Sequence, residues 1–336
     1  MPRIDYDIIK DKFEQFVRVF NTHDLDSLNN IIHQEARVNL SVINDRVDGS
    51  CHTIEGYKEF IRNYPKTDYL KCRIYNYICT LQGNEAQQFA YVICIASNEV
   101  EGTDKLEFFQ YAKIFSIHWH KYAEDWMMNS IKMDIYDRSQ VGTLDKYFKS
   151  KWHFEDYLAV LKPGVHTQCC MSDFDSPWLA IENPEDVYTE EEKVKYGLYH
   201  YNYGIDQLCF YHCLDGIADS YNVSGTRHHN EGKRNWLTNI KFNRQKARYW
   251  VHPYKFLDID IEGDRAYVRC CRMAGSGQTA REYVWTKDNV NIEHACADCH
   301  IEMVKEKGMW RMCYFGYDTG LYEVDEYSDN YYGDMV

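Results

Sequence analysis

Cysteine and histidine side chains that could hold a cofactor lie close together near the end of the chain. The segment Cys296-Ala-Asp-Cys299-His300 has the spacing that attaches c-type haem. However, polar and apolar residues alternate over 293–304, which predicts a β-strand that directs Cys296 and Cys299 to opposite faces. Haem attachment needs both sulfurs on one edge, so we expect neither haem nor a thiolate zinc site here.

The polar face of this predicted strand carries five groups that could bind a metal: His294, Cys296, Asp298, His300 and Glu302. They could line a polar pocket or form a metal site, but a solvated sheet face or an interface is the simpler interpretation. The histidine pairs at 118/120 and 228/229 have loose spacing and no identifiable third ligand. The sequence therefore predicts no metal site.

A single histidine, His252, stands among aromatic residues directly before Pro253. In a strand, Trp250, Tyr254 and Phe256 would share its face, because alternate side chains point the same way. That arrangement suits an aromatic-walled pocket with one basic group, and core packing explains it equally well. The residues alone leave both interpretations open.

The apolar spacing of the first half predicts helices followed by strands. Residues 9–20 form one apolar stripe at helical spacing, and 25–32 predict a second, short helix that Asp24 can cap. Alternation over 37–42 predicts a strand, and a third helix is expected after Thr53. Further strands are expected at about 70–81, 88–98, 106–118 and 126–136.

The second half repeats this order. Glu55-Gly56 reappears as Glu231-Gly232, and Gly83-Asn84-Glu85-Ala86 reappears as Gly263-Asp264-Arg265-Ala266. Asp125-Trp126-Met127-Met128 corresponds to Met309-Trp310-Arg311-Met312. A period of about 180 residues is far longer than a solenoid repeat, so we interpret it as the duplication of a whole domain.

The repeat sets the expected domain boundaries. We predict a first domain over 1–138, an aromatic-rich connector over 139–187, a second domain over 188–318 and an acidic tail over 319–336. The connector holds one expected helix, 144–161, which Pro163-Gly164 ends.

This order of elements, with Phe20-Asn-Thr-His-Asp-Leu-Asp-Ser-Leu28 closing the first helix, resembles the nuclear transport factor 2-like superfamily. It resembles in particular the polyketide-cyclase-like (SnoaL-like) branch, over about 6–136 and 190–318. The resemblance implies an α+β fold of two tandem cone-shaped domains, each with three N-terminal helices packed on a curved, mostly antiparallel sheet. The family includes isomerases, dehydratases, cyclases and binders, so the fold alone does not give the function.

Ketosteroid isomerase, one member of this group, uses a carboxylate base with a tyrosine and a protonated acid. The resemblance places Phe16 at the tyrosine position of the first domain and Leu40 at the base position. A leucine cannot accept a proton, so this chemistry is not expected there. The corresponding base position of the second domain falls near Ser220, which is no base either.

The dehydratase-like members pair a histidine base with an aspartate near the end of the first helix. Counting back from the Gly-Asp-x-Ala turn gives His252 in the second domain and Cys72 in the first. The partner aligns with Asp206 or with Asn202, and only the aspartate can stabilise an imidazolium by its charge. Asp206 could instead cap the next helix, so the partner stays open.

The resemblance implies a pocket in each domain. The residues expected around these pockets are Trp250, Tyr254, Trp236 and Tyr201 in the second domain, and Phe16, Leu40, Cys72 and Asn76 in the first. The expected function is a cofactor-independent lyase or isomerase, dehydratase-like, that acts on a hydrophobic, ring-containing small molecule. The alternative is a non-catalytic tandem that binds a small molecule or a protein.

Composition limits the other functions. The 336 residues carry a net charge of −14, which argues against nucleic acid or anionic lipid as a partner. No apolar run approaches the roughly 18 residues of a membrane span. Thirteen cysteines, an odd number spread along the chain, indicate a reducing compartment, so we expect a cytoplasmic protein. We expect the two copies to pair as an internal pseudo-dimer, or the chain as a homodimer, through their sheet faces.

Overall fold

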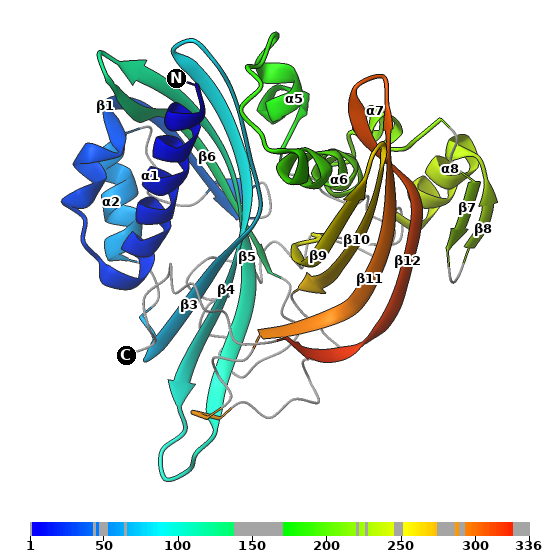
Figure 1. Ribbon diagram of the computed structural model, residues 1–336. Helices are drawn as coiled ribbons and strands as arrows, with labels where there is room; N and C mark the ends of the chain where they lie inside the picture. Colours follow the sequence, from blue (N-terminus) through cyan, green and yellow to red (C-terminus); the bar gives the residue numbers. More distant parts are fainter. Residues whose placement is uncertain are drawn as a thin grey trace.

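The computed structural model describes residues 2–42, 45–46, 53–63, 66–137, 171–219, 222–225, 228–244, 251–273, 286–288 and 293–324. The fold is α+β, with one group of elements before residue 138 and a second after residue 189 (Figure 1). Trp250, Ser220, the expected helix 144–161 and the end of the tail lie outside the described residues.

The first group is a six-stranded sheet covered on one face by helices. The strand order is β2-β1-β6-β5-β4-β3, and every neighbouring pair is antiparallel except β1 and β6. Its elements are α1 (Pro2–Thr22), η1 (Ser27–Asn30), β1 (Ile32–Val42), β2 (Asp45–Arg46), α2 (Ile54–Arg62), β3 (Tyr69–Gln82), β4 (Glu85–Glu99), β5 (Leu106–Tyr122) and β6 (Asp125–Asp137).

The helical stripe of the first helix is buried against this sheet. Phe13, Phe16 and Phe20 of α1 pack on the inner face, together with Tyr57 of α2. The predicted start of α2 is confirmed, because the Thr53 hydroxyl accepts a hydrogen bond from the Gly56 N–H. Where the sequence predicts a second helix over 25–32, the structure has only the short 3₁₀ turn η1. The strand β1 already begins at Ile32.

The second group contains a four-stranded antiparallel sheet, a two-stranded hairpin and three helices. The sheet order is β12-β11-β10-β9, and β7 pairs with β8. Its elements are α6 (Glu190–Asp206), α7 (Phe210–Asp215), β7 (Asn222–Gly225), β8 (His228–Glu231), α8 (Lys233–Arg244), β9 (Tyr254–Glu262), β10 (Arg265–Met273), β11 (Glu293–Glu306) and β12 (Met309–Val324). The segment before it holds η2 (Asp173–Asp175) and α5 (Pro177–Ala180).

The last strand is longer than the sequence pattern predicts. Residues 319–324, which we assigned to the acidic tail, continue β12. Thr319 and Tyr322 pair with Ala297 and Ala295 of β11, and the Val324 side chain is buried. Ladder pairing and burial outweigh the acidic composition of this segment.

The two groups share an apolar layer on the outer face of the first sheet. Figure 1 shows α1 and α2 on one side of that sheet and α6 with the second sheet on the other. Side chains from both groups form this layer, which we call the interdomain layer: Tyr75, Ile78, Phe89, Tyr91, Ile93, Ala112, Ile114, Met171, Tyr203, Cys209, Val251, Cys271, Met273, Ala295 and Val324. Among the described helices, none has the length and hydropathy needed to cross a membrane.

Candidate functional site

His252 and Asp206 form a buried hydrogen-bonded pair in the second group. Asp206 is the last residue of α6, a helix started by a capping box between Thr189 and Glu192. His252 lies two residues before β9. The His252 Nδ1 lies 2.5 Å from Asp206 Oδ1. The pairing with Asp206 that the sequence left open is thus present, and Asp206 does not cap α7, whose N-cap residue is Cys209.

The second carboxylate oxygen of Asp206 is also fixed. It accepts hydrogen bonds from the backbone N–H of His252, at 2.8 Å, and from the Tyr91 hydroxyl, also at 2.8 Å. Tyr91 lies on β4 of the first sheet, so the two groups of elements meet at this carboxylate. Together with the His252 ring at Oδ1, these two donors fix the orientation of the Asp206 carboxylate.

With Nδ1 on the Asp206 carboxylate, the imidazole ring directs its other nitrogen, Nε2, away from that carboxylate. The side chain of His252 is 8% exposed and that of Asp206 is 0% exposed. Because water is largely excluded, the Asp206 charge acts on the imidazole through a medium of low polarity, where electrostatic interactions are strong. The pair therefore has the parts of a general base with an orienting carboxylate.

Asn202 lies one helical turn before Asp206 on α6 and does not hydrogen-bond to His252. Its side chain is 1% exposed. Within the described part of the chain, neither its amide nitrogen nor its amide oxygen has a hydrogen-bond partner. A buried amide without partners costs free energy, so it is a donor and acceptor that a ligand or a water could satisfy.

Asn76 belongs to this site and not to the interior of the first domain, where the sequence analysis placed it. Its amide nitrogen donates to the His252 carbonyl at 2.8 Å, and its amide oxygen accepts from the Tyr254 N–H at 3.0 Å. Asn76 has a φ of 50° at an irregularity of β3 between Tyr75 and Ile78. The left-handed backbone turns the side chain across the interface, so that the first sheet fixes the segment that carries His252.

The described aromatic residues expected around the second pocket come together in one buried cluster. The Trp236 Nε1 donates to the Tyr201 hydroxyl at 2.9 Å, and Tyr254 packs in the same apolar core. Burial raises the pKa of Tyr254 well above its ordinary value, so it stays a neutral phenol. These residues lie on α8, α6 and β9, and His252 lies in the segment between α8 and β9.

The positions expected around the first pocket are packed core. Phe16, Leu40 and Cys72 are at most 2% exposed. The Phe16 ring stacks on Tyr57 with centroids 5.2 Å apart. The sulfur of Cys72, which the sequence analysis aligned with His252, lies 3.4 Å from that of Cys94. Burial raises the pKa of Cys94, but its hydrogen bond with Cys72 and the Lys113 charge outweigh this and lower the pKa to about 7.

The cofactor-like motif near the end of the chain forms the strand that its alternation predicts. Cys299 packs in the core of the second group, whereas Asp298 on the opposite face pairs with Arg269 at the surface. Cys296 faces Arg272. His118 and His120 both contact the Glu85 carboxylate, at 2.9 and 2.6 Å. No group of three or more His, Cys, Asp or Glu side chains suited to a metal ion occurs within the described residues.

A second histidine pair was missed by the sequence analysis. The His212 Nδ1 lies 2.6 Å from His200 Nε2, and the His212 Nε2 lies 2.9 Å from the Ser176 hydroxyl. Trp178 stacks on His200 with ring centroids 4.5 Å apart. Burial lowers the pKa of His200 well below its ordinary value and that of His212 to about 4. No motif marks these residues, because they approach one another only when α5, α6 and α7 pack together.

Comparisons with known proteins give only distant likenesses. No protein-family model matches the chain, and no curated protein matches it. The hexachlorocyclohexane dehydrochlorinase LinA-type3 from Novosphingobium barchaimii LL02 is similar over 42% of this chain and 89% of its own, at 14% identity and a TM-score of 0.32. The Kfla4162 protein from Kribbella flavida is similar over 39% and 90%, at 13% identity and 0.32.

An NTF-2 like protein of unknown function from Silicibacter pomeroyi DSS-3 is similar over 40% of this chain and 98% of its own, at 11% identity and a TM-score of 0.29. Likenesses of this size carry no argument about the activity of this chain. Its function has to be argued from its own residues.

Proposed function

We propose that the chain is a cofactor-independent lyase or isomerase, dehydratase-like in its chemistry, with its active site in the second domain. The observation that supports this most directly is the 2.5 Å contact between His252 and Asp206. A buried carboxylate that holds the Nδ1 of a histidine orients the ring for proton transfer at Nε2 and stabilises the imidazolium that forms.

In the proposed step, the His252 Nε2 takes a proton from a substrate carbon next to the one that bears the leaving group. The electron pair of the broken C–H bond forms the new double bond, and the leaving group departs with its own electron pair. Asp206 stabilises the imidazolium, and Asn202 donates a hydrogen bond to the oxygen on which charge develops. For an isomerase, the imidazolium returns the proton to another carbon of the substrate.

The proposed substrate is a hydrophobic, ring-containing small molecule. Tyr201, Trp236 and Tyr254 pack in one buried cluster of the second group, and aromatic side chains of this kind favour flat, apolar ligands. Asn202 supplies the polar contact that orients such a ligand.

We further propose that the chain is a duplicated domain and that the first copy acts as a scaffold for the second. The bridge between Ile217 and Met312 is parallel, like the pairing of Ile32 with Met128 in the first sheet. Met128 and Met312 correspond in the sequence repeat. Cys72 replaces the base in the first copy, while Tyr91 and Asn76 of that copy reach the base of the second. In this proposal the interdomain layer serves as an internal pseudo-dimer interface.

Variants at the pair test the proposed activity. In a screen of cyclic β-hydroxy ketones for enone formation, His252→Ala should reduce kcat about 10²–10⁴-fold, the usual contribution of a general base. Asp206→Asn should also reduce kcat strongly, because an amide cannot offset the imidazolium charge. His300→Ala, an exposed histidine on β11, is the matched control. Turnover that persists in His252→Ala would exclude this mechanism.

A non-catalytic binder of the same fold is the second candidate. The observation that favours it is the low exposure of His252, which limits access to the pair. The two functions differ in one measurable respect. Binding of a hydrophobic ring compound that is unchanged in His252→Ala, without turnover in the wild type, would support the binder.

A further inference from the structure

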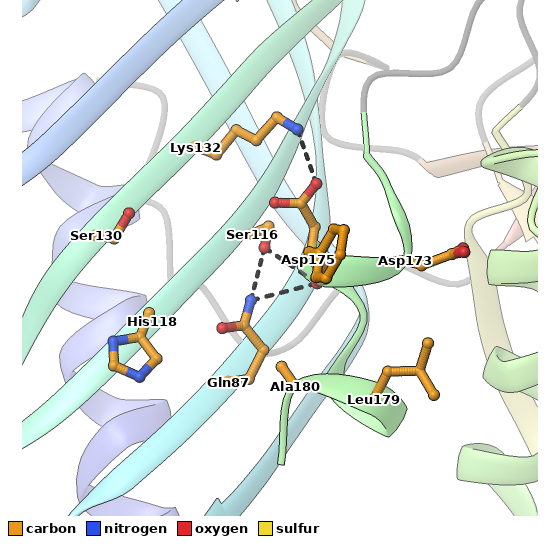
Figure 2. Close-up of a pocket in the computed structure, with 10 residues that line it drawn as sticks. Gln87, Ser116, His118, Ser130, Lys132, Asp173, Asp175, Leu179 and Ala180 are labelled. Carbon is orange, nitrogen blue, oxygen red and sulfur yellow. Dashed lines mark hydrogen bonds and ion pairs between the residues drawn. The ribbon is translucent and has the colours of Figure 1, made fainter. Parts of the chain in front are cut away.

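A cleft opens on the outer face of the first sheet, apart from the His252 site. Its floor consists of side chains from three strands: Gln87 from β4, Ser116 and His118 from β5, and Ser130 and Lys132 from β6. The residues of η2 and α5 form its other wall (Figure 2). The cleft measures about 520 Å³, which lies within the range of small-molecule sites.

The floor of this cleft is polar where the rest of the same sheet face is apolar. Phe89 and Tyr91 on β4, and Ala112 and Ile114 on β5, all belong to the interdomain layer. Further along these two strands, the same face carries polar side chains in place of these apolar ones: Gln87 on β4, and Ser116 and His118 on β5. Gln87 pairs with His118, and His118 with Ser130, in neighbouring register positions. Packing alone does not require this change, because both parts of the face are covered by later segments of the chain.

The polar groups of the floor are held in fixed positions. The Gln87 Nε2 donates to the Ser116 hydroxyl at 2.7 Å and to the Asp175 carbonyl at 3.3 Å, and Ser116 donates to the same carbonyl at 3.1 Å. Gln87 and Ser116 are only 5% and 4% exposed. Because both amide hydrogens of Gln87 are used, its carbonyl oxygen remains for a ligand (Figure 2). A preorganised amide of this kind is typical of a binding site.

The charged side chains on the floor of the cleft are compensated. The Lys132 Nζ pairs with Asp175 Oδ2 at 2.7 Å, and His118 contacts Glu85. Burial lowers the pKa of His118 below its ordinary value and outweighs the Glu85 charge, so the imidazole is neutral at pH 7. Asp173 adds a carboxylate at the rim. An anionic ligand would meet these carboxylates, so the cleft favours an uncharged molecule.

Apolar side chains stand at the edge of this polar cleft. Phe174 is 91% exposed and Leu179 is 50% exposed. An exposed aromatic ring beside fixed hydrogen-bonding groups suits a ligand with hydroxyl groups on its edge and C–H groups on its face. We propose that the cleft binds a neutral, polyhydroxylated small molecule, a sugar or cyclic polyol of one or two rings. This site is independent of the proposed activity at His252.

Calorimetric titration and saturation-transfer NMR of the full chain with glucose, maltose and myo-inositol test this proposal. Glucuronate and benzoate are the charged comparisons. We expect at least one neutral probe to bind more tightly than both anions, and Phe174→Ala or Gln87→Ala to weaken that binding about tenfold or more. Phe242→Ala, which removes another exposed ring, on α8, and His252→Ala should leave it unchanged.

Three results would overturn the proposal: no binding of any neutral probe, tighter binding of either anion, or neutral binding that Phe174→Ala does not weaken. Because Phe174 is exposed, this variant should fold even if Gln87→Ala does not. Loss of binding in His252→Ala would place the sugar in the other site instead. Failure of the proposed activity leaves these outcomes unaffected.

Discussion

At the scale of single residues, the Asp206 carboxylate connects the two halves of the molecule. It accepts hydrogen bonds from Tyr91, from the backbone of His252 and from the His252 ring. A buried charge is stable only when it is fully paired and hydrogen-bonded. Each of these donors therefore affects both the folding of the chain and the orientation of the proposed base.

The Tyr91→Phe variant measures the contribution of one of these donors. We expect the free energy of unfolding to fall by about 1.5–3 kcal/mol, the usual cost for a hydrogen bond to a charged group. Tyr69→Phe is the control, because its hydroxyl bonds Glu99 at the surface, where the loss should be small. Urea denaturation of the two variants gives both values, and equal losses would contradict a special role for Tyr91.

Asn76 allows a second test, because its backbone and its side chain contribute separately. Asn76→Ala removes both hydrogen bonds and keeps a Cβ at a φ of 50°, so we expect a loss of about 3 kcal/mol. Asn76→Gly also removes the bonds but tolerates the left-handed backbone, and should lose about 1 kcal/mol less. Thermal or urea unfolding that ranks alanine above glycine in stability would refute this explanation.

At the scale of elements, the short segment with η2 and α5 is attached to the helices of the second group through histidines. Ser176 bonds His212, His212 bonds His200, and Trp178 covers His200. Both imidazoles are buried, so their charged forms are disfavoured in the folded state. The attachment of α5 to α6 and α7 should therefore depend on pH.

The lowered histidine pKa values predict the direction of this dependence. The unfolded chain binds protons at these residues near pH 6.5, whereas the folded chain binds one at His212 only near pH 4. Stability is therefore complete above about pH 6.5 and falls as the pH drops towards 4. The loss at pH 5 from His212 alone should be about 2 kcal/mol.

Urea denaturation at pH 7 and pH 5 measures this slope. The double variant His200→Gln/His212→Gln should show a shallower dependence than the wild type, even if it is less stable at pH 7. His300→Gln, at an exposed position, should keep the wild-type slope. An unchanged slope in the double variant would show that other groups control acid stability.

At the scale of the whole molecule, the interdomain layer should make the two domains unfold together. It buries large apolar side chains such as Ile93, Ile114 and Met273 from both groups. Two buried polar residues of the first sheet, Tyr91 and Asn76, also hydrogen-bond to residues of the second group. Neither half can expose this surface without a large free-energy cost.

We therefore expect one cooperative unfolding transition. In urea, hydrogen exchange of peptides from α1 and from α6 should accelerate at the same denaturant concentration. The variant Ile114→Ala, which leaves a cavity in the layer, should shift both transitions by the same amount, about 2–4 kcal/mol. Separate transitions for α1 and α6 would show that the domains are independent.

The sequence alone determined the parts of the fold that depend on local periodicity. The stripe of α1, the Thr53 cap, the strands β3 to β6 and the strand nature of 293–304 all follow from side-chain spacing at 3.6 or 2 residues. The family resemblance pointed to His252 with either Asp206 or Asn202 as its partner, and local sequence could not choose between them because both lie on one helix, α6.

Only the tertiary structure decided what surrounds that pair. Tyr91 and Asn76 are more than a hundred residues away from Asp206 and His252 in the chain, and no local pattern encodes a contact at that separation. The same holds for the floor of the cleft under η2 and for the two buried histidines of α6 and α7. Each of these arrangements depends on which face of the first sheet the second group of elements covers. The packing of whole helices and sheets decides which face is covered.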